Sequence, residues 1–205
     1  MTDTDRPPPI DDPSAGGSAP DAASTSLAGE PLSHVAHSTS MELMVETVFL
    51  AEVLQEAWFV RRQLVDVMHS SVDAFGYDLV LQCGDVTRHV QLKAKRTGGS
   101  TSTYAINTLL TERPAGCVVC IEWRPHPDTH RLELSYRWLG NGPFERLHDL
   151  GDKISKHSRG NAKGQKGERP AMRDVKLTSF AKLASTSELV DRLFGPATIA
   201  ATRPS

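Results

Sequence analysis

The sequence predicts an α/β domain in which a helix precedes a three-strand antiparallel meander, a second helix and a further strand. The first observation is the segment 41–59, which is rich in helix-forming residues and contains neither glycine nor proline. The second is a pair of β-rich runs, 77–83 and 86–95, joined by the turn dipeptide Gly84-Asp85. The third is the continuous apolar run 116–123, which is typical of a buried central strand.

Composition divides the 205 residues into a central domain and two tails. Residues 1–40 are rich in Pro, Gly, Ser, Ala and Asp, and we expect them to be disordered. The folded domain is expected over residues 41–195, and a second disordered tail over 196–205. The first 40 residues carry six acids and one arginine, a net charge of −5, while the whole chain carries −2. The remainder therefore carries +3 and is mildly basic.

Three features lead us to expect a cytoplasmic protein without a membrane span. No apolar run approaches the roughly 18 residues that a spanning helix needs, and the N-terminus lacks the pattern of a secretory signal. The three cysteines, Cys83, Cys117 and Cys120, are too few for a disulfide framework. Cys117 and Cys120 form a CxxC, but on a strand this spacing turns the thiols to opposite faces. We therefore expect buried structural cysteines and no zinc site.

The first expected helix carries four glutamates, which point in different directions around its axis. At about 100° per residue, Glu46 lies nearest to the direction of the large apolar side chains. The other three lie farther round and are expected in solvent. A carboxylate at the margin of a buried face can reach a neighbouring sheet, so Glu46 is a candidate site residue. An exposed surface charge is the alternative that the sequence leaves open.

The hairpin brings polar side chains together on one face. A two-residue turn makes Cys83 pair with Val86, and this register puts Asp78 directly opposite Gln91. Side chains alternate with a period of two, so Lys93 shares the face of Gln91. The opposite face is apolar and consists of Leu79, Leu81, Val90 and Leu92.

A carboxylate, an amide and an ammonium on one face suit a site for a hard cation. Mg²⁺ (or Mn²⁺) takes oxygen ligands, commonly one or two carboxylates together with water and substrate phosphate. Paired Cβ atoms lie about 5 Å apart, so Asp78 and Gln91 can share one ion. Lys93 can orient a water molecule or balance charge on a phosphorane. A solvated polar face of an ordinary hairpin remains the alternative.

These residues resemble a known family. Gly76-Tyr77-Asp78, followed after twelve residues by Gln91-Leu92-Lys93, is similar to the D…(D/E)xK signature of the PD-(D/E)xK nuclease superfamily. The glutamine resembles the QxK motif of the Mrr-like restriction endonucleases, and the resemblance covers about residues 41–123. It implies a restriction-endonuclease-like core and a Mg²⁺-dependent nuclease. Asp78, Gln91 and Glu46 would hold the ion, and Lys93 would assist the attacking water. Gln91 departs from the commoner carboxylate, and a neutral ligand weakens Mg²⁺ binding.

The other elements follow from shorter patterns. Proline and glycine end several of them, and a Ser-x-x-Glu capping box opens the last helix. The ranges are 61–68 for the first strand, 104–110 for the second helix, 130–139 for an extra strand and 189–194 for the C-terminal helix.

The segment 153–176 carries eight Lys and Arg residues against two acids, and low hydrophobicity predicts a mobile loop in its middle. Such a basic segment can contact backbone phosphates, although a solvated loop is the alternative. The expected contacts to nucleic acid are Arg88, Lys95, Arg96, Lys163, Lys166 and Arg169.

Two functions remain open at this stage. The first is a nuclease that hydrolyses phosphodiester bonds of DNA, with RNA as the second choice. The second is a catalytically idle module with the nuclease fold that binds nucleic acid or a protein partner. A homodimer is among the oligomeric states that the sequence allows.

Overall fold

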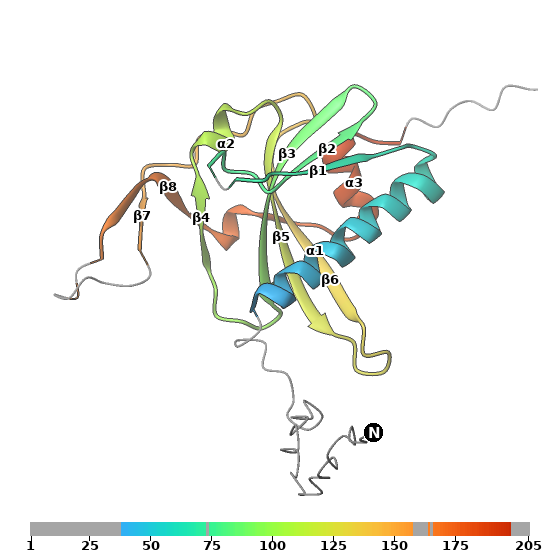
Figure 1. The fold of residues 1–205 in the computed structure, drawn as a ribbon, viewed down its shortest axis with the longest axis horizontal. Helices are drawn as coiled ribbons and strands as arrows, with labels where there is room; N and C mark the ends of the chain where they lie inside the picture. The colour runs from blue at the N-terminus through green and yellow to red at the C-terminus, as the bar shows by residue number, and fades with distance from the viewer. Residues whose placement is uncertain (1–37, 73, 158–163, 165, 198–205) are drawn as a thin grey trace, which may run out of the picture.

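The computed structural model describes residues 38–72, 74–157, 164 and 166–197, and shows a mixed α/β fold with few helices. Within these residues, helices α1 and α3 pack against one face of a six-stranded sheet and a three-stranded sheet packs against the other (Figure 1). None of the described helices is long and apolar enough to cross a membrane. Most of the two tails for which disorder is predicted lies outside the described residues.

The larger sheet contains the predicted meander. Its strands, in spatial order, are β1 (Asp66–His69), β2 (Leu79–Cys83), β3 (Val86–Arg96), β5 (Gly116–Pro125), β6 (Leu132–Gly140) and β9 (Ala181–Lys182). Strands β1, β2 and β3 pair antiparallel, and the predicted pairing of Cys83 with Val86 is confirmed. Strand β3 then pairs parallel with β5, which is buried in the middle of the sheet. The predicted extra strand over 130–139 is confirmed as β6, which pairs antiparallel with β5.

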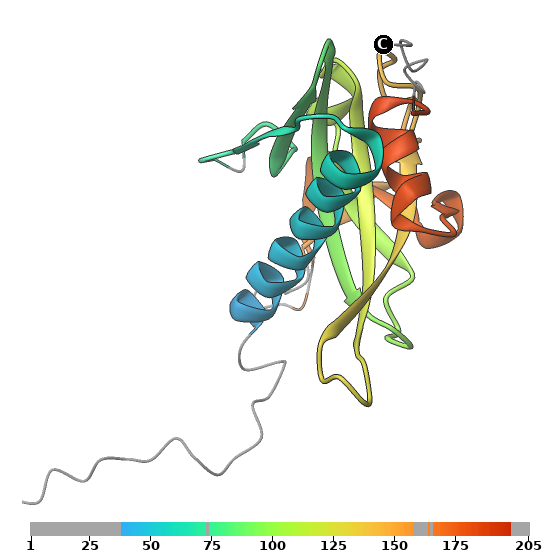
Figure 2. The same cartoon turned by 90° about the vertical axis from the view of Figure 1, so that its right-hand side faces the viewer.

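Helix α1 (Ser38–Gln55) runs along one face of the sheet, and one of its ends lies beside α3 (Thr186–Phe194), as Figure 2 shows. The helix begins three residues before the predicted start, so residues 38–40 belong to its first turn and not to the tail. The two helices cover the predicted apolar face of the hairpin. The fully buried side chains that they contribute to this core are Val45, Phe49, Val53, Leu189, Val190 and Leu193.

The first helix continues as a π-helix, η1 (Glu56–Arg61), and the first strand is therefore shorter than predicted. The prediction of a strand over 61–68 is wrong at its beginning, because Arg61 belongs to η1 and its side chain is buried against α3. Arg62 adopts a left-handed conformation with φ of 58° and ends the helical segment. Strand β1 begins only at Asp66.

The smaller sheet contains a strand where the sequence predicts a helix. Its strands, in spatial order, are β4 (Thr103–Asn107), β8 (Glu168–Lys176) and β7 (Ile154–Lys156). The prediction of a helix over 104–110 is wrong, since β4 is followed only by the single turn of α2 (Leu109–Glu112). Tyr104 and Ile106 are buried on one side of β4, and this period of two is that of a strand.

The basic segment 153–176 is more ordered than predicted. Its two ends form the antiparallel hairpin of β7 and β8, and β8 also pairs with β4. The middle of the predicted loop, residues 158–163 and 165, lies outside the described residues. A 3-10 turn, η2 (Leu177–Ser179), then leads to β9.

The cysteines and the C-terminal helix agree with the sequence analysis. Cys117 lies in the core under the helices and Cys120 in the core under the smaller sheet, so the two thiols do face opposite ways. The predicted capping box also forms: Ser185 Oγ accepts a 3.2 Å hydrogen bond from the Glu188 backbone N–H. The Glu188 carboxylate in turn accepts a 2.8 Å bond from the N–H of Ala184.

Candidate active site

Asp78 lies at the entrance of the hairpin and ties its two strands together. Its backbone N–H donates to the Val90 carbonyl at 2.9 Å, and its Oδ2 accepts a 2.6 Å hydrogen bond from the Leu92 N–H. The register of Leu79 opposite Val90 continues to Asp78 and Gln91, as predicted. The carboxylate is thus held against β3 one residue before Lys93.

A pocket of about 390 Å³ opens at this point between α1 and the end of the hairpin. Glu46 from α1, Asp78 from the position just before β2 and Lys93 from β3 all line it. Tyr104 of β4 forms another part of the wall. The structure therefore brings together three of the four residues predicted for the catalytic site, one from each of three elements.

His69, at the end of β1, is a site neighbour that the sequence analysis missed. Its Nε2 lies 2.8 Å from Glu46 Oε1. This contact holds the Glu46 carboxylate beside the sheet, where the sequence predicted that it could reach. The first strand predicted from the sequence ends at Met68, so no pattern distinguishes His69 from an ordinary surface residue.

Gln91 is placed differently from the other predicted site residues. Its side chain is almost fully buried, and its carboxamide oxygen has no hydrogen-bond partner among the described residues. It lines a second pocket of about 270 Å³, which shares Lys93 and Tyr104 with the first. Arg169 of β8 lies at the wall of this second pocket. The two pockets therefore adjoin each other at Lys93.

The side chains that line the two pockets include oxygen donors for a divalent cation. Within the described ranges, no group of three His, Cys, Asp or Glu side chains forms a metal-binding cluster. The pocket does offer three carboxylates, Glu42, Glu46 and Asp78, and oxygen donors of this kind suit Mg²⁺ or Mn²⁺. Gln91 lines the adjoining pocket, and a buried acceptor without a hydrogen-bond partner among the described residues indicates a missing water or ion. The residues present therefore fit a hard cation.

Tyr104 is a second wall residue that the sequence analysis missed, because its segment was predicted to be helical. Its hydroxyl oxygen accepts a 3.3 Å hydrogen bond from the Cys120 thiol. Burial raises the pKa of Tyr104 well above its ordinary value. The phenol therefore stays protonated and neutral between the two pockets.

The prediction that Arg88 contacts nucleic acid is wrong, because its side chain is fully buried. It lies on the core face of β3, opposite Leu81. Its guanidinium donates to the carbonyls of Leu193 at 2.7 Å and Arg192 at 2.5 Å. Arg88 therefore fastens the end of α3 to the sheet.

The other basic residues predicted to bind nucleic acid lie on two elements near the pockets. Lys95 and Arg96 lie at the end of β3, the strand that also carries Lys93. Lys95 Nζ donates to the Thr101 carbonyl at 3.2 Å. Lys166 is exposed just before β8, and Arg169 reaches the second pocket. Lys163 lies outside the described residues.

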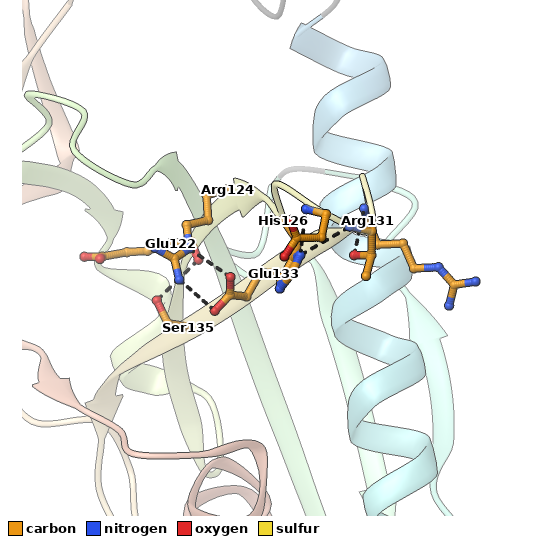
Figure 3. A network of polar contacts seen from close by, with 8 residues as sticks. Glu122, Arg124, His126, Arg131, Glu133 and Ser135 are labelled. Carbon is orange, nitrogen blue, oxygen red and sulfur yellow. Dashed lines mark hydrogen bonds and ion pairs between the residues drawn. The ribbon is translucent and has the colours of Figure 1, made fainter.

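A polar network at the outer end of β5 and β6 serves the hairpin that these strands form (Figure 3). Arg124 and Glu133 form a two-pronged ion pair with 2.9 Å contacts. The ring Nδ1 of His126 accepts from the backbone N–H groups of Asp128 and Thr129 at 3.2 and 3.3 Å. These contacts close an exposed turn, so His126 acts as a turn residue.

Neither a protein-family model nor a curated protein matches the chain.

Proposed function

We propose that the protein is a metal-dependent nuclease that hydrolyses phosphodiester bonds of DNA, with RNA as the second choice of substrate. The observation that carries the proposal is that Glu46, Asp78 and Lys93 come from three elements and line one pocket. The order of helix, antiparallel meander and parallel strand supports a restriction-endonuclease-like core of the Mrr-like type. The two observations are independent, because the first concerns the placement of side chains and the second concerns the order of helices and strands.

The proposed roles follow from the charge of each group. Asp78 and Glu46 would hold a Mg²⁺ or Mn²⁺ ion, with the Gln91 oxygen as a further donor. Such an ion, when bound, polarises a phosphoryl oxygen and lowers the pKa of water. Lys93 supplies an ammonium that can neutralise the charge that develops on the phosphorane. The Asp78 bond to Leu92 N–H and the His69 contact with Glu46 position the two carboxylates.

The surroundings of the pockets suit a polyanion. Arg169 reaches the pocket next to Lys93, and Lys95 and Arg96 continue along the same strand. We assign these residues, together with Lys163 and Lys166, to contacts with backbone phosphates. Phosphate contacts of this kind are independent of sequence and weaken with salt.

The test is the substitution Asp78→Asn, with Asp85→Asn in the turn of the same hairpin as a matched control. Asparagine keeps an acceptor for the Leu92 N–H but removes the charge, so the fold should survive while metal binding is lost. Cleavage of plasmid and linear DNA in Mg²⁺ or Mn²⁺ should fall by at least about 100-fold in Asp78→Asn, because the carboxylate that would hold the ion is lost. Asp85→Asn should cleave as the unchanged protein does.

Four measurements decide the outcome: cleavage assays, a binding assay with DNA and RNA, calorimetric titration with Mg²⁺ and Mn²⁺, and melting temperature without metal. Full activity in Asp78→Asn would remove this pocket from the reaction. If the unchanged protein binds nucleic acid but cleaves neither DNA nor RNA with either metal, the idle binding module is the correct function.

A further inference from the structure

The outer face of α1, which points away from the sheet, carries no charge. At about 100° per residue, the side chains from 41 to 58 that lie within about 60° of the outward direction are all uncharged. They are Leu43, Met44, Thr47, Ala51, Leu54 and Gln55 of α1 and Trp58 of η1, which continues the helix. The four glutamates of this helical segment all lie more than about 110° from the centre of that face. We call these seven residues the outer face of α1.

The two polar side chains of the outer face satisfy their hydrogen bonds within the helix. Thr47 Oγ1 donates to the Leu43 carbonyl at 2.7 Å, and Gln55 Nε2 donates to the Ala51 carbonyl at 3.0 Å. The face therefore gains little from contact with water. Leu43 is nevertheless 66% exposed and Trp58 54% exposed. An exposed apolar face of this kind on a helix normally packs against another surface.

The size of the side chains along the face fits an antiparallel helix of the same kind. The small residues Thr47 and Ala51 lie in the middle, where two helix backbones can approach closely. Large residues lie at both ends, Leu43 and Met44 at one and Trp58 at the other. In an antiparallel pair, the large residues of one end meet those of the other end, and the macrodipoles oppose each other favourably.

A groove of about 450 Å³ lies at one end of the outer face and would accept the opposite end. Leu54, Trp58 and Phe59 line it together with Leu64 of the segment before β1. Phe59 and Leu64 are themselves strongly exposed. The protruding side chains at the start of α1, Leu43 and Met44, have the apolar character and the reach to enter such a groove on a second molecule.

We propose that this face is the interface of a homodimer in which two α1 helices pack antiparallel about a two-fold axis near Thr47 and Ala51. The exposed apolar side chains contribute on the order of 100 Å² each, or roughly 600 Å² per copy. A pair of copies then buries about 1,200 Å², which is where specific interfaces begin. The interface is independent of the proposed nuclease activity.

The first experiment uses the full chain and its own tryptophan. Of the three tryptophans, Trp123 and Trp138 are 7% and 3% exposed, so quenching by acrylamide reports mainly on Trp58. Sedimentation equilibrium should give the dimer mass at concentrations in the micromolar range. Quenching should rise on dilution as the dimer dissociates. A monomer mass at every concentration overturns the proposal, and so does a monomer with a protected Trp58, which would mean that another segment of the same chain covers the face.

The second experiment is Leu54→Glu, with Phe144→Glu as a matched control. Leu54 lies in the proposed interface, whereas Phe144, which is 74% exposed, lies in the loop after β6. A glutamate at Leu54 should raise the dissociation constant of the dimer by at least about 30-fold, because the charge would be buried without a partner. Phe144→Glu should leave the dimer unchanged.

Circular dichroism of both variants checks that α1 is intact. Quenching of Trp58 in the unchanged protein tests the dimer without any substitution. A dimer that is equally stable in Leu54→Glu overturns the proposal. Equal loss of the dimer in the two variants overturns it too. DNA cleavage or its absence has no bearing on either readout.

Discussion

Arg88 lies fully buried on the core face of β3, and its guanidinium group donates hydrogen bonds to backbone carbonyls. Besides its bonds to the end of α3, it donates to the Asn141 carbonyl at 3.0 Å and lies 5.2 Å from the centre of the Trp138 ring. Carbonyl oxygens and an aromatic face thus replace water around the cation. Burial lowers the pKa of Arg88 but leaves it a cation at neutral pH, because arginine starts far above that range.

Arg88→Ala should destabilise the protein by about 3 kcal/mol or more, because several buried carbonyls lose their donor and a cavity opens beneath α3. Arg96→Ala, at the exposed end of the same strand, should change stability by less than about 0.5 kcal/mol. Urea denaturation measures both values. A loss for Arg88→Ala as small as that for Arg96→Ala would contradict the fastening role.

Single residues could be predicted from the sequence only where a pattern fixes their direction. The period of two placed Asp78 and Lys93, and helix geometry placed Glu46 near the sheet. Nothing comparable exists for His69, whose contact with Glu46 depends on how β1 passes α1. Arg88 was misplaced because its charge suggested solvent, although the same alternation puts it on the apolar face.

At the scale of elements, the hairpin was predicted with the correct register because a two-residue turn leaves no freedom in the pairing. The segment 104–110 was misread because short apolar runs fit both helix and strand. What decides the outcome there is β8, a pairing partner more than 60 residues away in the sequence. Local patterns contain no information on such a partner.

The loop that precedes Asp78 depends on a glycine. Gly76 has φ of +79°, and a Cβ built on it would lie 2.9 Å from the Cβ of Asn107. Gly84, in the hairpin turn, has φ of +56° but open space around it. Gly76→Ala should therefore cost about 2 to 4 kcal/mol, from both backbone strain and overpacking. Gly84→Ala should cost only the strain, about 1 kcal/mol.

Urea denaturation of the two alanine variants checks this difference. Because Gly76 is followed after one residue by Asp78, the first variant should also weaken metal binding in a calorimetric titration. Equal costs for the two substitutions would show that the contact with Asn107 relaxes freely.

For the whole molecule, one sheet separates two cores, and each contains a buried thiol. Burial raises the pKa of Cys117 from 9.0 to about 12 and also raises that of Cys120. Below pH 9 these thiols are protonated in the folded and unfolded chains alike. At higher pH the unfolded chain loses the proton first, so the free energy of unfolding falls as pH rises.

Cys117→Ala should make the protein less sensitive to alkaline pH. The Cys117 thiol alone should remove about 1 kcal/mol of stability between about pH 9 and about pH 10, and this share disappears in the variant. Urea denaturation under reducing conditions at several pH values measures it. An identical fall in both proteins would show that the Cys117 thiolate is tolerated in the core.

Contacts between the first and the last helix have a consequence for the order in which the chain can fold during synthesis. Arg61 donates to the carbonyls of Ser187 and Gly195, and Thr186 donates to Glu52, across separations of 126 to 134 residues. While a ribosome is still making the middle of the protein, α1 and the meander lack the helix that completes their core. Part of the apolar surface of α1 and of the sheet therefore stays uncovered until α3 has emerged, and exposed apolar surface of this kind makes a nascent chain prone to aggregation.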